Sequence, residues 1–388
     1  MLDQTLGGTA ASPNASVVFV TRKWPPAVGG METYSRRLTE AISAERAIRV
    51  IAAPGREDGS PPSAIALVLF GLRAGWRLLA PRLAPRLTHR HTAALLHIGD
   101  MALWPLALPA RLRGCRVVVL SAHGTDVGFA RRRNLKGRLY RAYLQLGAWL
   151  LPRLFSRRAV IANSAATATA LREVGFPATR IVPLATDLRL SGMPPTIPAK
   201  RLLFAGRLIK RKGLGWFVRS VLPGLPEEIG LDVAGTVWDA DEGTALEDRR
   251  VRFLGPLPPE ALAQAYREAL AVIVPNVAGA EGEFEGFGLV AAEAAVAGAV
   301  VLAARRDGLV EAVRDGETGF LLPSGDAAAW QSRIIEVAGW QGEARAAFVA
   351  QAQVRAAEVY SWQRVAADTM AVYDALMASQ ATDNPKDR

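Results

Sequence analysis

Short apolar runs alternate with longer amphipathic runs along nearly the whole chain, and this alternation limits the possible folds more than any other feature. A first series of apolar runs spans residues 16–21, 48–53, 93–98, 116–121, 159–162 and 181–184; a second spans 201–205, 231–234, 251–254, 271–275, 299–303 and 319–322. The runs between them have helical spacing, for example 31–44, 135–151, 165–174, 288–296 and 327–337. Apolar strands that alternate with helices are typical of parallel sheets covered on both faces. We therefore predict an α/β protein with two doubly wound, Rossmann-like parallel-sheet domains.

A change in composition near residue 190 indicates the domain boundary. Residues 191–200 contain three prolines and a glycine, which prevent a continuous helix or strand. The charge balance changes at the same place, from 28 basic and 10 acidic residues in 1–200 to 19 basic and 26 acidic residues in 201–388. We predict an N-terminal domain at 1–186, a linker at 187–200, a C-terminal domain at 201–360, a helix at 361–378 that packs back toward the N-terminal domain, and a tail at 379–388.

Composition excludes several classes of protein. A chain of 388 residues with 50% hydrophobic and 21% charged residues is neither disordered nor fibrous. The single cysteine, Cys115, excludes a disulfide framework and a multi-cysteine metal site, and the four histidines do not suggest a zinc enzyme. The N-terminus shows no secretory signal, and no apolar stretch reaches the roughly 20 residues of a spanning helix. We expect a cytoplasmic protein.

The basic first half is expected to face something anionic, which could be nucleic acid, a membrane surface or a phosphorylated substrate. Nucleic acid is disfavoured, because the basic cluster at 131–138 has no interleaved aromatic residue. Residues 67–86 repeat apolar residues with Arg73, Arg77, Arg82 and Arg86. Such a segment can lie on anionic lipid as a peripheral contact. The general rule that surface helices are amphipathic favours a core helix with a solvated face instead.

Ligands of doubly wound sheets bind at the loops that follow the strands. In the first half, Gly29 and Gly30 open a helix whose unpaired N–H groups could receive a phosphate, although a tight turn would need the same glycines. His123 follows the run 116–121, with Gly124 and Asp126 close by. A histidine in this setting suits a substrate contact as well as a structural role.

In the second half, the run 201–205 leads into a basic loop at 206–213. Four cations stand within six residues of this loop. Arg207 could fork two phosphate oxygens, while Lys212 could supply a point charge. A solvated basic turn is the alternative. Because the surrounding domain is acidic, however, the basic cluster does not simply reflect the average composition of the domain.

The strongest signal lies at residues 285–293. Gly286 and Gly288 open a helix, with Glu285 at its mouth and Glu293 about 12 Å further along, because each residue of a helix adds about 1.5 Å. A glutamate that accepts from a ribose diol is a natural partner of phosphate-binding amides. Glu293 also stands in a run of alanine and valine, where a charge should have a partner.

Taken in this order, the residues resemble the glycosyltransferases of family 4, which have the GT-B architecture. The landmarks are Gly29-Gly30 with Glu32, His123-Gly124, Gly206-Arg207 with Lys212-Gly213, the pair Glu285 and Glu293, and Ser361-Trp362. The resemblance implies two domains that face each other across a cleft. It also implies retaining transfer of a sugar from a nucleoside diphosphate sugar (UDP, GDP or ADP) to an acceptor hydroxyl, with no metal and no cofactor.

The same resemblance implies roles for individual residues. The implied catalytic residues are His123, Arg207, Lys212 and Glu285. The residues implied in nucleotide-sugar binding are Gly29, Gly30, Arg207, Lys212, Glu285, Phe287, Gly288, Leu289 and Glu293. The two cations would neutralise the departing diphosphate. The N-terminal domain would receive a saccharide or lipid-linked saccharide acceptor at the inner membrane face, in polysaccharide or glycolipid biosynthesis of the cell envelope.

The sequence departs from the family pattern in two places. The usual Gly-Gly turn after residue 300 is replaced by Arg305-Arg306-Asp307-Gly308, and the run 48–53 lacks the Gly-His pair that often precedes it. A nucleotide-sugar epimerase on the same architecture is the alternative function, and it would need cleft carboxylates for acid and base steps. The pair Glu285 and Glu293, together with Ser361-Trp362, favours the transferase.

Overall fold

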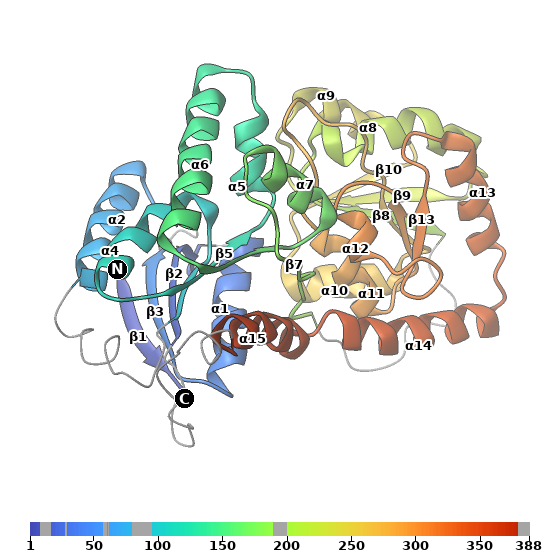
Figure 1. Cartoon of the computed structure of the whole chain (residues 1–388). Helices are drawn as coiled ribbons and strands as arrows, with labels where there is room; N and C mark the ends of the chain where they lie inside the picture. The colour runs from blue at the N-terminus through green and yellow to red at the C-terminus, as the bar shows by residue number, and fades with distance from the viewer. Residues whose placement is uncertain are drawn as a thin grey trace. The chain divides into compact units, whose positions relative to one another are not determined.

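The computed structural model describes residues 1–7, 17–27, 29–56, 60, 62–79, 95–188 and 200–378. Most of the predicted linker at 187–200 and the tail at 379–388 lie outside these ranges, as do Arg82, Arg86, His89 and His91. The chain divides into two compact units (Figure 1). Unit 1 is Met1–Leu184 with Trp362–Arg388, and unit 2 is Ala185–Ser361.

Unit 1 is built on a sheet whose seven described strands have the order β1-β3-β2-β4-β5-β6-β7. The strands are β1 (Leu2–Leu6), β2 (Val17–Trp24), β3 (Ile48–Pro54), β4 (Leu95–Ile98), β5 (Val117–Ala122), β6 (Arg157–Ala162) and β7 (Arg180–Ile181). All neighbours are parallel except β1, which runs antiparallel to β3 at the edge. The prediction of an entirely parallel sheet is therefore wrong at this edge. The central strand β5 is buried along its whole length, as its apolar sequence predicts.

The helices of unit 1 differ in how they begin, and some of them have a side-chain cap. The helices are α1 (Gly30–Ser43), α2 (Ala64–Leu79), α4 (Ala107–Leu112), α5 (Thr125–Gly128), α6 (Leu135–Leu154), α7 (Ala165–Glu173) and α15 (Trp362–Ala378), with the short 3₁₀ helices η2 (Met101–Leu106) and η3 (Phe129–Arg131). The side chains of Asp100, Asn134 and Ser164 accept from N–H groups in the first turns of η2, α6 and α7.

Helix α15 belongs to unit 1 although it ends the described chain. Its Tyr373 hydroxyl lies 2.5 Å from Nδ1 of His97 in β4, and both side chains are fully buried. Its Arg364 donates to the Pro183 carbonyl at 2.5 Å, just after β7. A buried polar pair of this kind needs both partners, so α15 is an integral part of the unit 1 core.

Unit 2 is built on a sheet whose six described strands are all parallel, in the order β10-β9-β8-β11-β12-β13. The strands are β8 (Arg201–Ala205), β9 (Gly230–Ala234), β10 (Val251–Gly255), β11 (Val272–Val274), β12 (Val301–Ala304) and β13 (Phe320–Leu322). The main helices are α8 (Leu214–Trp216), continued by a π-helical turn (Phe217–Val221), α9 (Ala240–Gly243), α10 (Pro259–Glu268), α11 (Leu289–Ala297), α12 (Leu309–Ala312), α13 (Ala327–Ala338) and α14 (Gly342–Val359).

The prediction of two doubly wound α/β domains is confirmed, with a mixed sheet in unit 1 and a parallel sheet in unit 2. Within the described ranges, no helix is both long enough and apolar enough to cross a membrane. In each unit the loops at the carboxyl ends of the central strands carry the predicted site residues. Doubly wound sheets bind their ligands at this edge.

Candidate functional site

The basic loop of unit 2 leaves the carboxyl end of β8 and turns sharply before α8. Lys212 and Arg211 are each only 9% exposed, whereas Arg207 is exposed. The loop ends at Gly213, whose φ of 75° is left-handed. A Cβ atom at Gly213 would lie 2.1 Å from the Pro275 carbonyl oxygen that follows β11. Only glycine permits this close approach, which turns two buried cations toward β11.

Glu285 is the partner of these buried cations. Its Oε2 accepts from Lys212 Nζ at 2.6 Å, from Arg211 at 2.7 Å and from Asn276 Nδ2 at 3.1 Å. Burial alone would raise the pKa of Glu285, but the charges and hydrogen bonds of Lys212 and Arg211 lower it to about 2. The carboxylate is therefore ionised, and two cations against one anion leave a net positive charge at the ends of β8 and β11. Such a charge is suited to a diphosphate.

Arg207 does not join these contacts to Glu285. Its guanidinium lies 4.9 Å from the ring centroid of the exposed Trp238, which follows β9. The sequence predicted Arg207 and Lys212 as the cations that bind phosphate, whereas the structure brings Arg211 and Lys212 together at Glu285. Arg211 and Asn276 were missed as site residues. Asn276 could have been found by its position two residues after β11.

The loop from Glu285 to Gly288 is held tightly against the turn that precedes α12. Gly308 donates its N–H to the Glu285 carbonyl at 2.9 Å, and a Cβ atom on Gly308 would lie 2.3 Å from the Gly286 carbonyl oxygen. Gly288 has a left-handed φ of 96°, and a Cβ atom there would lie 2.4 Å from Leu309. These contacts fix the backbone N–H groups that open α11.

Two further predicted residues of this loop lie at the start of α11. The Phe287 side chain is buried with its ring edge-on to Tyr360, and Leu289, the first residue of the helix, is half-buried. They anchor the loop through packing, which leaves their backbone N–H groups as the atoms that can meet a ligand.

Asp307 occupies the position at which the family pattern has its first glycine. Its φ of 48° makes it the one non-glycine residue of the described chain with a left-handed backbone. Aspartate tolerates this conformation better than most residues. Its carboxylate accepts from the Glu285 N–H at 3.4 Å and from Arg306 at 3.2 Å. The turn therefore keeps a glycine-like shape despite the substitution, and it adds a carboxylate beside Glu285.

Glu293 has the partner that its apolar surroundings require. The buried Tyr266 of α10 donates its hydroxyl to Glu293 Oε2 at 3.4 Å. Burial raises the pKa of Glu293, and the Tyr266 hydrogen bond and the charge of Lys212 partly offset this rise. A carboxylate held by one long hydrogen bond keeps most of its capacity to accept from another donor.

In unit 1, His123 follows β5 and is 7% exposed. Its Nε2 lies 3.2 Å from the Gly99 carbonyl, its ring packs edge-on to Tyr34, and its buried Nδ1 has no partner among the described residues. Burial lowers the pKa of His123 to about 4, so the imidazole is neutral near pH 7. A neutral ring with an unsatisfied nitrogen is suited to bind a hydroxyl.

An acidic pair with an arginine lies beside His123, and of these three residues only Asp126 was named from the sequence. Asp126 accepts from the backbone N–H of His123 at 2.9 Å, so it orients the backbone and not the imidazole. Asp100, fully buried after β4, pairs with Arg22 at 2.5 Å. Burial and the charge of Asp100 raise the pKa of Asp126. Arg22 lies near the carboxyl end of β2, and Asp100 and Asp126 follow β4 and β5. Positions at this edge of the sheet are the signal that could have identified Arg22 and Asp100 as site residues.

The Gly29-Gly30 turn opens α1 with no side-chain cap. Gly29 is half-buried and Gly30 is exposed, so the N–H groups of the first turn are accessible. Glu32 is 7% exposed and pairs with Lys23 at 3.3 Å, and a Cβ atom on Gly29 would lie 2.4 Å from its carboxylate. The turn keeps the form of an anion site, although its own acid balances Lys23.

Comparison with known proteins gives two family matches, one for each half. The family model described as Glycosyltransferase Family 4 matches residues 28–190, and that described as Glycosyl transferases group 1 matches residues 199–339. A D-inositol 3-phosphate glycosyltransferase from Corynebacterium efficiens is 31% identical over 54% of this chain and 46% of its own length. A phosphatidyl-myo-inositol mannosyltransferase from Mycobacterium leprae is 32% identical over 50% of this chain and 51% of its own. The chain thus spans about half the length of the curated relatives it matches.

Solved structures with the same fold cover nearly the whole chain. A sucrose-phosphate synthase from Thermosynechococcus elongatus matches with a TM-score of 0.65 and 21% identity, over 94% of this chain and 100% of that one. Anabaena HepE in complex with UDP-glucose matches with a TM-score of 0.64 and 18% identity, over 94% and 99%. At these identities the likeness concerns the fold, and the predicted GT-B class is confirmed. The comparisons give no support to the epimerase alternative.

Proposed function

Because the chain belongs to the family 4, group 1 glycosyltransferases, we propose that it transfers a sugar from a nucleoside diphosphate sugar to an acceptor hydroxyl with retention of configuration. The observation that carries the proposal is the buried cluster of Lys212, Arg211 and Glu285 at the ends of β8 and β11. Its net positive charge lies beside the loop that opens α11. A diphosphate is the donor group that such a charge and such N–H groups would bind together.

In this proposal the cations stabilise the leaving group. As the bond between the anomeric carbon and the diphosphate oxygen breaks, Lys212 and Arg211 neutralise the developing charge, and Arg207 approaches from the exposed side of the loop. The acceptor oxygen bonds to the anomeric carbon on the same face, and its proton passes to the leaving phosphate oxygen. No protein base and no metal are needed for these steps.

Two side chains of unit 2 would position the donor. The contacts of Glu285 to Lys212, Arg211 and Asn276 all use Oε2, so Oε1 is the oxygen offered to a sugar hydroxyl. Glu293 would accept a hydrogen bond from the ribose diol, while the Tyr266 hydroxyl donates to its Oε2. In unit 1, His123 is neutral and its Nδ1 is unsatisfied, so this ring is suited to bind a sugar hydroxyl.

A panel of nucleotide sugars tests the donor site. We expect one class among UDP-, GDP- and ADP-sugars to raise the melting temperature of the protein, because a ligand at 100 times its dissociation constant adds about 2.7 kcal/mol to stability. The shift should persist with a chelator. Glu293→Gln should weaken that nucleotide about 10- to 100-fold, the range for a lost hydrogen bond to a charged group. Glu336→Gln, an exposed carboxylate of α13, is the matched control.

The outcomes of this panel separate the parts of the proposal. A shift abolished by the chelator would contradict the metal-independent mechanism. Equal shifts in wild type and Glu293→Gln would remove the ribose assignment. No shift with any nucleotide sugar would contradict the donor class itself.

We also propose a place for the reaction, at the inner face of the cell membrane, with a lipid-linked or saccharide acceptor of the cell envelope. The support is charge: the chain up to residue 200 carries 28 basic against 10 acidic residues, and cytoplasmic leaflets are anionic. Flotation with vesicles of phosphatidylglycerol and phosphatidylcholine should show binding that falls with salt. Arg73→Gln should weaken it about fivefold, since one basic residue near the surface contributes about 1 kcal/mol.

The control for the vesicle experiment is an exposed arginine of the acidic unit. Arg249→Gln should bind vesicles as the wild type does. Equal binding to neutral and anionic vesicles, or an equal loss in both variants, would show that unit 1 charge does not direct the contact.

A further inference from the structure

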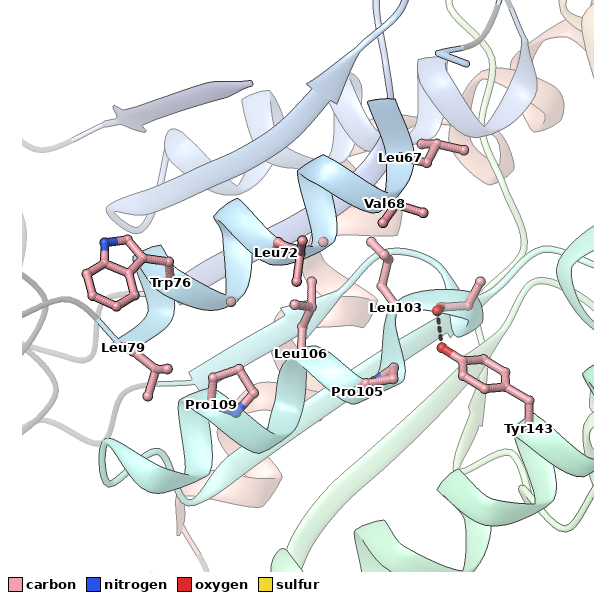
Figure 2. Close-up of a pocket in the computed structure, with 13 residues that line it drawn as sticks. Leu67, Val68, Leu72, Trp76, Leu79, Leu103, Pro105, Leu106, Pro109 and Tyr143 are labelled. Carbon is pink, nitrogen blue, oxygen red and sulfur yellow. Dashed lines mark hydrogen bonds between the residues drawn. The ribbon is translucent and has the colours of Figure 1, made fainter. Parts of the chain in front are cut away.

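An open groove of about 550 Å³ lies in unit 1 between α2, η2, α4 and α6 (Figure 2). Its size falls within the range of small-molecule sites, about 300–1,000 Å³. Figure 2 shows Leu72 of α2 and Leu106 of η2 pointing toward one another across it. The polar side-chain groups of its lining are the Trp76 indole N–H and the Tyr143 hydroxyl, which donates to the Ala102 carbonyl at 2.6 Å. The side chains of the groove therefore offer a ligand apolar contact and no charge.

Two glycines of α2 keep the groove open. A Cβ atom at Gly71 would meet no heavy atom within 4 Å, and one at Gly75 would only touch Leu106 and Pro109, at 3.8 and 3.9 Å. Glycine inside a helix is less favourable than alanine by about 0.5–1 kcal/mol. Neither helix stability nor a close contact therefore explains these two glycines. Their effect is to leave space along one face of the helix.

The same helix exposes a continuous apolar stripe beside the groove. Ile65, Val68, Leu72 and Trp76 are 75%, 65%, 69% and 72% exposed, and their spacing of three or four residues places them on one face. Val68, Leu72 and Trp76 also line the groove, so stripe and groove are one surface. Apolar patches of this kind mark sites of interaction with a protein or a membrane.

The charged residues beside the stripe favour a membrane over a protein as its partner. Arg73 and Arg77 each follow a residue of the stripe, so they lie about 100° further round the helix, along its edge. Both are exposed, and Arg77 also pairs with Asp3 at 2.9 Å. An apolar stripe edged by arginines is the arrangement of a helix that lies in the interface of an anionic membrane. A groove that opens from such a stripe faces the hydrocarbon region.

We propose that this groove holds one hydrocarbon chain of an anionic lipid, with the stripe on the lipid surface and Arg73 and Arg77 toward the headgroups. The inference rests on the proposed function, because a lipid-linked acceptor would bring such a chain to unit 1. It goes further in naming the site on the protein that would receive the chain.

Single-chain lipids test the groove directly. Lysophosphatidylglycerols of increasing chain length, kept below their micellar concentrations, are titrated into the full chain by calorimetry. In the wild type, affinity should rise about fourfold per methylene, which corresponds to about 0.8 kcal/mol, and level off once the groove is full. Gly71→Leu should lower affinity for the longest chains at least tenfold. Gly71→Ala, which adds one methyl group, should bind as the wild type does.

Several results would overturn the proposal. Equal affinity in wild type, Gly71→Ala and Gly71→Leu at every chain length would show that the groove is not used, and Gly75→Leu repeats the comparison one turn later. A dimer in sedimentation that Gly71→Leu dissociates would assign the groove to a second copy of the chain. The nucleotide-sugar panel, run on the same samples, separates the two proposals. If no nucleotide sugar binds to the wild type, the transferase proposal is contradicted. If a nucleotide sugar binds but lipid affinity does not depend on chain length, only the groove proposal is contradicted.

Discussion

Lys212→Ala is expected to lower turnover about 10²–10³-fold, the range for removing one preorganised group that stabilises developing charge. Lys212 is 9% exposed and its Nζ lies 2.6 Å from Glu285. Its loss removes one cation from the diphosphate site. It also leaves the Glu285 carboxylate with a single cationic partner, Arg211. The measurement is single-turnover transfer from the donor identified by thermal shift, which separates chemistry from binding.

The matched control is Lys210→Ala, because Lys210 stands in the same turn but is exposed. It should retain turnover within a few-fold. Equal losses in Lys210→Ala and Lys212→Ala would indicate a general effect of loop charge, and near-wild-type turnover in Lys212→Ala would remove the diphosphate assignment.

Acid unfolding gives Lys212→Ala a second readout. The pKa of Glu285 is lowered from 4.5 to about 2, so its ion pairs contribute stability that is present above the unfolded value and lost as pH falls through the folded value. Removal of Lys212 raises the folded pKa. The contribution of Glu285 to stability should therefore be smaller in the variant, and its loss should be complete at a higher pH than in the wild type.

Gly213→Ala is expected to destabilise unit 2 by about 3 kcal/mol or more. The left-handed backbone alone costs a residue with a Cβ about 1–2 kcal/mol. The new Cβ would also lie 2.1 Å from the Pro275 carbonyl oxygen, which neither backbone can relieve without moving the cation loop from β11. For a unit of this size the melting temperature should fall by roughly 10 °C, at about 2–4 °C per kcal/mol.

Gly316→Ala separates the backbone effect from the collision. Gly316 has nearly the same φ, 78°, but a Cβ atom there would meet nothing within 4 Å. Its melting temperature should fall by only roughly 3–6 °C. Equal losses in the two variants, measured by calorimetry, would show that the contact with Pro275 is not what requires glycine at 213.

The regular parts of the fold were predictable because burial dictates their sequence. The run 201–205 predicted β8, which is observed at Arg201–Ala205, since a central parallel strand is apolar on both faces. Strand β1 was not predicted. Asp3 and Gln4 do not look like part of a strand, and β1 depends on its pairing with β3 and on the ion pair of Asp3 with Arg49.

The site was predictable as a set of loops but not as a set of contacts. The basic loop and the Glu285 loop were both identified, yet the cation beside Lys212 is Arg211 and not Arg207. The direction of each side chain depends on a short 3₁₀ turn that ends at a left-handed glycine, and sequence spacing does not show this. The contact of His97 with Tyr373 joins residues 276 positions apart, which no local pattern reveals.

The exposed surface of helix α2 also could not be predicted from the sequence alone. The repeat of apolar residues and arginines predicted an amphipathic helix, and left open whether its exposed face would be polar. Which face is covered depends on η2 and α4, more than 20 residues later in the chain. The structure buries Phe70, Ala74 and Leu78, so α2 has a core face, and it exposes the apolar residues Val68, Leu72 and Trp76 on the solvated face.

The placement of α15 in unit 1 has a consequence for how the protein is made. Unit 2 is one uninterrupted stretch, Ala185–Ser361, whereas unit 1 draws its last helix from beyond it. Domains generally fold as units during synthesis, and most chains complete the N-terminal one first. Here the order is reversed. His97 and the Pro183 carbonyl cannot form their contacts with Tyr373 and Arg364 until the ribosome has synthesised all of unit 2. The half of the protein that is synthesised first is thus the last to be completed, and a nascent chain stopped before residue 362 can hold a finished unit 2 beside an unfinished unit 1.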